Sequence, residues 1–288
     1  MRQLILLIFC FMSSSCLFAQ KNIVGESSFS HFYFVLDSTA YQTLRTNSFC
    51  KDSLFYSQEG KAVTDQGSWA GNYLTGYYDY MEVMNEDASN SIVAGSIGLG
   101  NMLHRPPELK QLQLQWQQLI DDSIQTVYFT EKLKDTIIVE LMNYRDSMLT
   151  GGKACFFVMY YHPKIMLQSG FSKKTWEAGI TQEMMNKIGY GKMPEKRLYK
   201  KIEKITLNLT AHEFKRHRIA LKAMGYQQSG KLTYKKEIEI AIIIKKNPAH
   251  RLQQIDFSLN RSTNTKKIKL SNAAFIQVAG DKGKLVIK

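Results

Sequence analysis

The sequence predicts an α+β protein of two βαβββ modules that form cupped, mixed or antiparallel sheets, with a helical insertion between them. The first observation is the stretch from Ser30 to Met84, where hydrophobic residues alternate, then take helical spacing, then alternate again. The second is a similar pass that starts at Ile202, runs through a helix ending at Gly225 and continues into further strands. The third is a hydrophobic content of 44%, with 15 Phe and 15 Tyr, which is enough to fill a large core.

The first strand of the first module is predicted over residues 30–36. Both of its faces are largely apolar, so we expect a central strand that is covered on both sides. His31 stands near its start, on the same face as Tyr33 and Val35. Asp37 or Ser38 then stands where a helix N-cap is expected, and a short helix follows.

Three more strands complete the first module. They are expected over residues 53–64, 69–74 and 77–84, with a tight hairpin at Thr75-Gly76 before the last. Alternation places on one face of this last strand Tyr78, Tyr80, Glu82 and Met84. A carboxylate on a strand lined by aromatic rings is costly to bury without a partner, which makes Glu82 a candidate functional residue.

Residues 1–19 have the pattern of a signal peptide that is removed on export. Arg2 provides a positive charge, Leu4 to Met12 is an apolar run too short to span a bilayer, and Ala19 precedes a cleavage site at Gln20. A lipoprotein anchored through Cys16 is the alternative. However, the position three residues before Cys16, where lipoproteins usually have an aliphatic residue, is occupied by Ser13. We therefore expect an exported protein, periplasmic or secreted, with no transmembrane segment.

We place the first module at residues 20–104, a connecting region of helix and strands at 105–200, and the second module at 201–288. The connecting region contains a helix that starts at Pro106-Pro107 and a buried strand over 154–161 that ends at His162. A histidine at a strand end is a candidate ligand, although a loop histidine is the more common role.

The two halves of the chain differ in charge. Residues 186–288 hold 24 Lys and Arg against 7 Asp and Glu, whereas residues 21–185 hold 13 against 18. The basic half is either a solvated face or a contact surface for anionic lipid or glycan. Aromatic residues do not interleave with its Lys residues, so no specific nucleic-acid site is predicted. Outside the leader only Cys50 and Cys155 remain, as buried thiols or as a pair.

A strand that begins with His31, a helix, three antiparallel strands and a closing aromatic-x-x-Glu segment at Glu82 resemble one module of the vicinal oxygen chelate superfamily. This is the glyoxalase, bleomycin-resistance and extradiol-dioxygenase group. The resemblance covers residues 28–100, and the second pass extends it. In that family the first and fourth strands of a module are neighbours, and the His and Glu at these places bind a divalent metal.

The resemblance therefore implies that His31 and Glu82 bind a divalent metal such as Zn, Fe, Mn or Ni. The matching positions of the second pass fall near Lys204 or Thr206 and near Gln254 or Asp256, and they hold no His-Glu pair. A third ligand would then be Asp256 or His162.

Three classes of function are compatible with these features. The first is a metal-dependent lyase, isomerase or dioxygenase acting on a small oxygenated molecule, with Glu82 as a ligand or as a general base. The second is a non-catalytic module that binds a small molecule in a cup lined by Trp69, Tyr78, Tyr80 and Met84. The third is an interaction protein that uses its basic half on anionic surfaces. A homodimer is compatible with all three.

Two hydrolase classes are not supported. No GxSxG motif is present, so a serine hydrolase triad cannot be argued. His212, Glu213 and His217 form HExxxH, which is one residue longer than the zinc-protease motif HExxH and does not place both His residues on one helix face. Thr210 and Glu213 instead predict a capping box.

Overall fold

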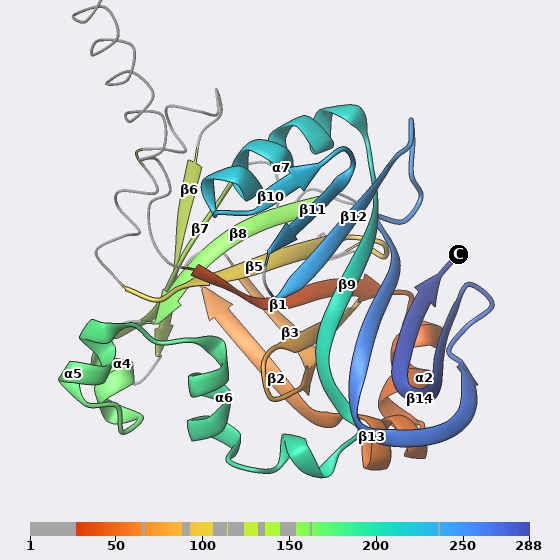
Figure 1. Ribbon diagram of the computed structural model, residues 1–288, viewed down its shortest axis with the longest axis horizontal. Coiled ribbons are helices and arrows are strands. Elements are labelled where there is room, and N and C mark those ends of the chain that lie inside the picture. Colours follow the sequence, from red (N-terminus) through yellow and green to blue (C-terminus); the bar gives the residue numbers. More distant parts are fainter. Residues whose placement is uncertain are drawn as a thin grey trace, which may run out of the picture.

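The computed structural model describes residues 27–64, 67–87, 93–105, 114, 124–131, 136–144, 154–161, 163–235 and 237–288. Within these ranges the chain forms two sheets, a closed barrel of eight strands and a six-stranded sheet (Figure 1). This agrees with the two-module α+β fold that the sequence predicts. The expected leader lies outside the described residues, and so does the helix expected after Pro106, apart from Leu114.

The first half of the barrel is the predicted βαβββ unit. β1 (Ser27–Leu36) runs parallel to β4 (Tyr80–Asn85), and β3 (Gly67–Thr75) and β2 (Tyr56–Thr64) follow in antiparallel order. The first and fourth strands are therefore neighbours. Between β1 and β2 the chain forms α2 (Ser38–Thr46) and a π-helical turn, η1 (Phe49–Leu54). Of the two candidate caps of α2, Asp37 and Ser38, the cap is Asp37, whose carboxylate accepts a hydrogen bond from the Ala40 N–H at 2.8 Å.

The second half of the barrel repeats this strand order. β5 (Ile97–Leu103) runs parallel to β8 (Ala154–Tyr161), and β7 (Thr136–Tyr144) and β6 (Ile124–Glu131) follow in antiparallel order. β1 pairs with β5, and a single pairing of Thr64 with Phe129 joins β2 to β6. The boundary predicted at residue 104 therefore falls inside a structural unit, and β6 to β8 complete the barrel instead of connecting two modules. Hydrophobic periodicity identifies these strands but not their partners.

The six-stranded sheet contains a third unit with the same strand order. β9 (Tyr199–Leu209) runs parallel to β12 (Ile238–Ile244), and β11 (Leu232–Lys235) and β10 (Gln227–Ser229) follow in antiparallel order. α7 (Ala211–Ala223) connects β9 to β10.

A long hairpin completes this sheet. β13 (Leu252–Lys269) pairs with the free side of β9, and β14 (Ala274–Ile287) pairs with β13. The predicted second pass is thus present, but its fourth strand is β12. The positions compared with Glu82 in the sequence, Gln254 and Asp256, lie on β13 instead.

Short helices link β8 to β9. They are α4 (Pro163–Gln168), α5 (Lys173–Ala178), α6 (Gln182–Tyr190) and the 3-10 turn η3 (Pro194–Lys196). Figure 1 shows α4, α5 and α6 together on one side of the barrel. Side-chain oxygens of Ser172 and Thr181 cap α5 and α6. Among the helices of the described ranges, none has the length and apolar character needed to cross a bilayer.

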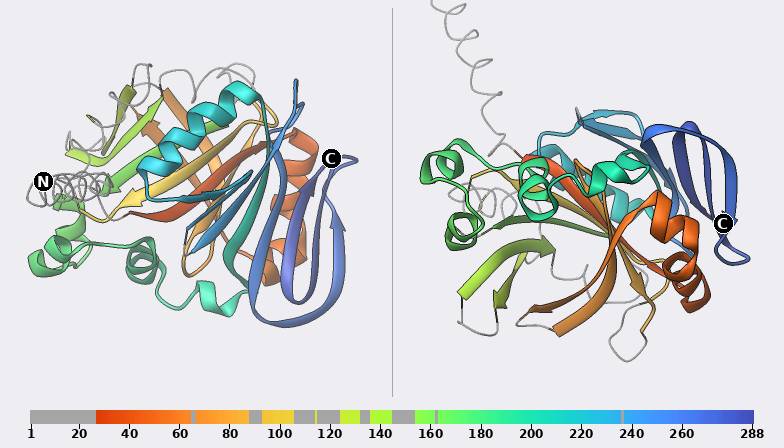
Figure 2. Two further views of the ribbon diagram at one scale, coloured as in Figure 1. Left: turned by 45° about the horizontal axis from the view of Figure 1, so that its top comes forward. Right: turned by 90° about the horizontal axis from the view of Figure 1, so that it is seen from below.

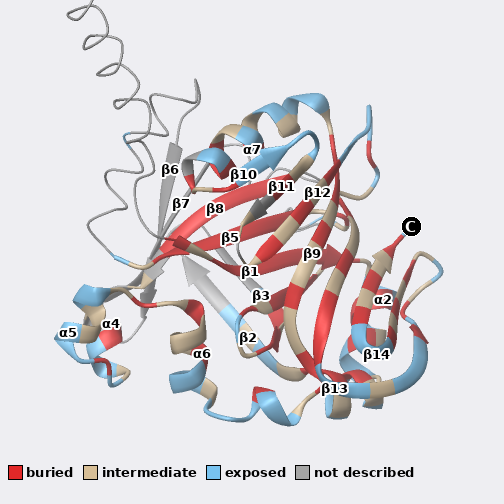
Figure 3. Ribbon diagram, in the orientation of Figure 1, coloured by how far each residue is buried: buried red, intermediate tan, exposed pale blue. Residues whose placement is uncertain are grey.

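Alternation divides the barrel strands into an outer and an inner face. On the outer face, Phe32, Phe34 and Leu36 of β1 join one large core with the six-stranded sheet and α2. Figure 2 shows the six-stranded sheet on one side of the barrel. On the inner face, Tyr33 and Val35 pack with residues of β4 and β8. β1, β5 and β8 are buried along almost their whole length (Figure 3), which confirms the prediction of a central first strand.

Buried polar contacts join the barrel to the six-stranded sheet. Asp79, between β3 and β4, accepts hydrogen bonds from the Tyr199 hydroxyl and, at 2.9 Å, from the Ile202 N–H. Burial raises the pKa of Asp79 to about 7 despite these two donors. The Tyr226 hydroxyl donates to Asn101 on β5 at 2.8 Å. Cys50 and Cys155 are both buried thiols and are not joined in a disulfide, which confirms one of the two predicted alternatives.

Candidate functional site

His31 and Glu82 both lie on the inner face of the barrel. Each is 4% exposed. β1 and β4 run in register, with His31 beside Tyr80 and Tyr33 beside Glu82. Because side chains alternate, Tyr80 and Glu82 share the face on which His31 stacks against Tyr80. The two residues that the sequence selects therefore line one interior, on neighbouring strands.

The imidazole of His31 is held between aromatic rings. Its centroid is 4.3 Å from that of Tyr80, with the rings nearly parallel, and 5.1 Å from that of Phe157 on β8. Gly100 on β5 makes room for it, because a Cβ at this position would lie 2.8 Å from Cε1 of His31. Burial lowers the pKa of His31 to about 3, so the ring is neutral at ordinary pH.

The carboxylate of Glu82 accepts a hydrogen bond from the Tyr73 hydroxyl on β3. Burial, and then the charge and hydrogen bond of Glu82, raise the pKa of Tyr73. The pKa of Tyr33 and that of Tyr80 are also raised, chiefly by burial. These phenols are therefore neutral hydroxyl groups around a carboxylate.

Helix α6 covers the end of the barrel at which β1 begins. Gln182 bonds to the Ser30 hydroxyl and to the Tyr161 hydroxyl. Asn186 bonds to the carbonyls of Gly76 and Tyr77. These contacts fix α6 across the strand ends nearest to His31.

A small pocket lies at the same end, beside the interior. Its lining comes from β5, β8 and the helices that follow: Met102, Leu103, His104, Tyr161, Met166, Trp176 and Ile180. The Nε1 atom of Trp176 is buried and has no hydrogen-bond partner among the described residues. Tyr161 links this pocket to the interior, because it also packs against the cluster that contains Tyr33.

The remaining predicted ligand-binding residues have different positions. Tyr80 and Met84 line the interior as expected. Tyr78 does not, because β4 begins only at Tyr80; Tyr78 is 39% exposed and packs edge-to-face on Tyr77. The loop of residues 76–79 replaces the predicted two-residue hairpin, which removes Tyr78 from the alternation of the strand. Trp69 belongs to β3, but its side chain lies outside the described residues.

Neither of the two proposed third metal ligands is among the described residues of the barrel interior. His162 lies outside the described residues. Asp256 belongs to β13 in the other sheet and bonds to Gln254 at 2.7 Å, so it is no part of the barrel interior.

A metal centre of the kind implied by the resemblance is not assembled by the described residues. Within them, no group of three His, Cys, Asp or Glu side chains is arranged to hold a metal ion. β5 and β8 contribute to the interior Gly98, Gly100, Cys155, Phe157 and Met159. Cys155 bonds to the Tyr33 hydroxyl. His31 and Glu82 alone are fewer ligands than protein metal sites require.

Several residues of the site carry no clear signal in the sequence. Tyr33 is the exception, since alternation places it on the face of His31. Tyr73 and Tyr161 depend on which strands pair, and Ser30, Gln182 and Asn186 depend on a bulge and on a distant helix. No local pattern marks these five residues.

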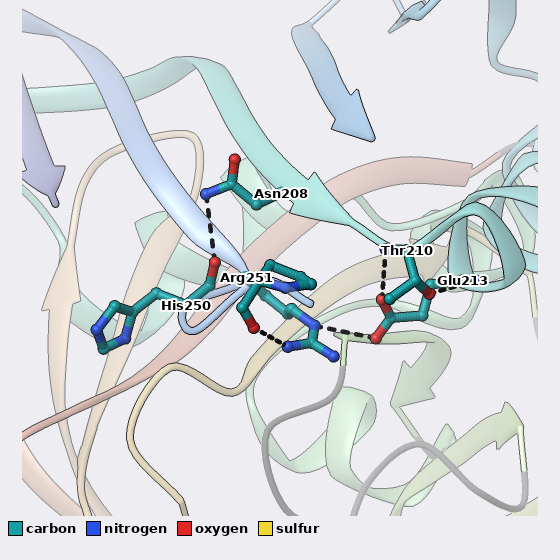
Figure 4. Close-up of polar contacts among 6 residues, drawn as sticks. Asn208, Thr210, Glu213, His250 and Arg251 are labelled. Atoms are coloured by element: carbon teal, nitrogen blue, oxygen red, sulfur yellow. Dashed lines mark hydrogen bonds and ion pairs between the residues drawn. The ribbon is translucent and has the colours of Figure 1, made fainter. Parts of the chain in front are cut away.

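The HExxxH segment has a structural role. Thr210 and Glu213 form the predicted capping box of α7, and Glu213 also pairs with Arg251 at 3.0 Å (Figure 4). Burial alone would raise the pKa of Glu213, but the hydrogen bonds from Thr210 and Arg251 outweigh it and lower the pKa. The role of Glu213 is therefore to cap the start of α7 and to pair with Arg251.

A comparison with known protein families gives a match. The model of a family of unknown function, DUF5829, matches residues 29–284, which extend from β1 into β14. No curated protein matches the chain. The family model thus covers the barrel and the six-stranded sheet as one unit.

Proposed function

We propose that this chain, which belongs to the family of unknown function DUF5829, is an exported glyoxalase-like protein that binds a small molecule inside its barrel. The neighbouring first and fourth strands of each half support the glyoxalase-like assignment. The signal-peptide pattern of residues 1–19 supports export. The site is defined by His31, Glu82 and the tyrosines around them.

The observation that carries this proposal is the burial of His31 and Glu82 among aromatic rings on the described part of the barrel's inner face. His31 and Glu82 are each 4% exposed and lie among the rings of Tyr73, Tyr80 and Phe157. Burial of a carboxylate costs several kcal/mol unless other groups compensate, and apolar residues of similar size would give a more stable barrel. Such groups are typical of binding and catalytic sites.

Thermal unfolding in the presence of a library of small molecules tests this proposal. A ligand at about 100 times its Kd stabilises the folded state by roughly 2.7 kcal/mol, which raises the Tm by a few degrees. We expect Tyr80→Phe and Glu82→Gln to weaken this stabilisation. Tyr78→Phe is the matched control, because it removes the hydroxyl of an exposed tyrosine two residues away. Equal ligand stabilisation in all three variants would refute a site inside the barrel.

A metal-dependent enzyme is the second candidate. It is favoured by the Nδ1 atom of His31, which bonds to Ser30 Oγ at 3.0 Å, since metal-binding histidines commonly have their second ring nitrogen hydrogen-bonded. His31 and Glu82 would be two ligands, and His162 is the proposed third. Metal analysis of protein purified without chelators decides between the candidates. A stoichiometric divalent ion that His31→Gln and Glu82→Gln abolish would support the enzyme candidate, and substoichiometric metal in the wild type would reject it.

A further inference from the structure

Ser30 occupies a β-bulge beside His31. The pairing of β1 with β5 shifts between Phe29 and His31, so Ser30 is an extra residue without a partner on β5. The bulge lets two successive side chains reach the same end of the barrel, and Ser30 is completely buried there. Its Oγ atom lies 3.0 Å from His31 Nδ1 and 2.6 Å from Gln182 Oε1.

Asn186, Gln182, Ser30 and His31 form a series of hydrogen-bonded side chains. Two main-chain carbonyls determine the direction of every hydrogen bond in this series. The carbonyls of Gly76 and Tyr77 can only accept, and both lie 3.3 Å from Asn186 Nδ2. The Asn186 amide is therefore oriented with Nδ2 toward them. Its Oδ1 atom then accepts from Gln182 Nε2 at 2.9 Å.

The orientation of Gln182 determines the tautomer of His31. With Nε2 bonded to Asn186, Gln182 presents its Oε1 to Ser30, so the Ser30 hydroxyl donates. A hydroxyl has only one proton. Ser30 Oγ must therefore accept from His31, which carries its proton on Nδ1. The lone pair of the neutral imidazole is then on Nε2.

We infer that Ser30, Gln182 and Asn186 are positioning residues that hold His31 in the Nδ1–H tautomer, so that its Nε2 accepts a hydrogen bond from an O–H or N–H group of the ligand. This inference rests on the proposed function and specifies the ligand class. Among the described residues, the interior then presents His31 Nε2 and the Glu82 carboxylate as acceptors next to aromatic rings. A small aromatic alcohol or amine fits this arrangement, whereas a carboxylate or phosphate would face the negative charge of Glu82.

The tautomer can be measured without any ligand. In protein labelled with 15N-histidine, NMR distinguishes a protonated from an unprotonated ring nitrogen, and the signals missing from His31→Gln assign the residue. We expect Nδ1–H in the wild type. Gln182→Leu removes the acceptor of the Ser30 hydroxyl, which can then donate to Nδ1, so we expect the proton to move to Nε2. Ser30→Thr keeps the hydroxyl and is the matched control.

Two results of this measurement would overturn the inference. One is an Nε2–H signal for His31 in the wild type. The other is the same tautomer in Gln182→Leu as in the wild type. Neither result affects the proposed function, because a site inside the barrel does not depend on the tautomer.

The ligand class is tested with three probes of similar size, benzyl alcohol, benzylamine and benzoate, by isothermal titration. We expect the alcohol or the amine to bind more tightly than benzoate, and Gln182→Leu to weaken it about tenfold, the value of one hydrogen bond. Tighter binding of benzoate would overturn the inference while leaving a site in the barrel. The proposed function would be rejected instead if none of the three probes bound and if, in the thermal test, Glu82→Gln and Tyr80→Phe left the stabilisation by ligands unchanged.

Discussion

The first and third βαβββ units have the same strand order. They differ in the sheet face that lies opposite the helix of each unit. In the first unit, β5 to β8 close the barrel over this face, and His31 and Glu82 are buried on it beside the half-buried Tyr80. In the third unit, only the β13–β14 hairpin is added and the sheet stays open. Lys204 of β9 and Glu239 of β12 form an ion pair on this sheet, with side chains 40% and 36% exposed.

The difference shows that enclosure, and not strand order, gives a polar residue its importance in this protein. A half-exposed ion pair such as Lys204–Glu239 contributes about 0–1 kcal/mol and is ordinary surface charge. An enclosed carboxylate such as Glu82 must be compensated by several kcal/mol of interactions. The three copies of one strand order therefore do not imply three sites, and the predictions below test this distinction.

The largest effect on stability is expected from Asp79→Ala, which removes the buried hydrogen bonds of Asp79 between the barrel and the six-stranded sheet. The buried Tyr199 hydroxyl and Ile202 N–H would lose their acceptor, and each unsatisfied donor costs about 1–3 kcal/mol. We expect a loss of about 2–5 kcal/mol in the free energy of urea unfolding. Asp281→Ala, at an exposed position, is the control and should stay within about 0.5 kcal/mol of the wild type. If Asp79→Ala changed the free energy of unfolding as little as the control, the hydrogen bonds of Asp79 would not stabilise the fold.

The same carboxyl predicts a pH dependence of stability. Burial raises the pKa of Asp79 from 3.8 to about 7, so the folded state binds more protons than the unfolded state between these values. Its contribution to stability is complete below pH 3.8 and is lost as the pH rises through about 7. We expect Asp79→Asn to flatten the decline of unfolding free energy over this window. An unchanged slope in Asp79→Asn would assign the decline to other groups.

Two glycines allow the same substitution to be compared in the two regions. A Cβ at Gly98 would lie 1.9 Å from the Tyr33 ring inside the barrel, and one at Gly283 would lie 2.1 Å from the Phe257 ring in the six-stranded sheet. We expect Gly98→Ala and Gly283→Ala each to reduce stability by about 1–3 kcal/mol, because a ring must move. Only Gly98→Ala should also change ligand affinity, since Tyr33 lines the site. Gly189→Ala, with no atom within 4 Å, is the control.

A smaller effect separates two glutamates of the third unit. Glu213 and Arg251 are only 12% and 14% exposed, and Glu213 also completes the capping box of α7. We expect Glu213→Ala to cost about 1–2 kcal/mol. Glu239→Ala, on the open face, should cost less than about 1 kcal/mol. Equal losses, measured by urea unfolding, would contradict the view that enclosure decides the importance of a polar residue.

The sequence predicts local features of the fold well and its long-range partners less well. The alternation of β1, the caps of α2 and α7, and the strand-helix pair of β9 and α7 all follow from patterns within short windows. The joining of β5 to β8 does not, because a parallel pair separated by more than 50 residues leaves no local signal. For this reason β6 to β8 are predicted as part of a connecting region.

The candidate site shows the same limit. His31 and Glu82 are found because each stands on a strand with a clear alternation. Tyr78 is misplaced because a loop longer than the predicted hairpin shifts the strand start to Tyr80. Gln182 is missed because it lies 152 residues from Ser30, and only the tertiary fold brings the two side chains to 2.6 Å.

The smallest effect concerns the basic charge of the six-stranded sheet. Exposed Lys and Arg side chains gather on the β13–β14 hairpin: Arg261, Lys266, Lys267, Lys269 and Lys282. If this is a solvated face, binding of the full chain to phosphatidylglycerol vesicles should be weak and should vanish near 0.15 M salt, where charges are screened beyond about 8 Å. Lys267→Glu with Lys269→Glu should abolish what remains at low salt. Binding that persists at high salt would contradict this view. The open sheet would then carry a specific site, so a site in this protein would not require enclosure.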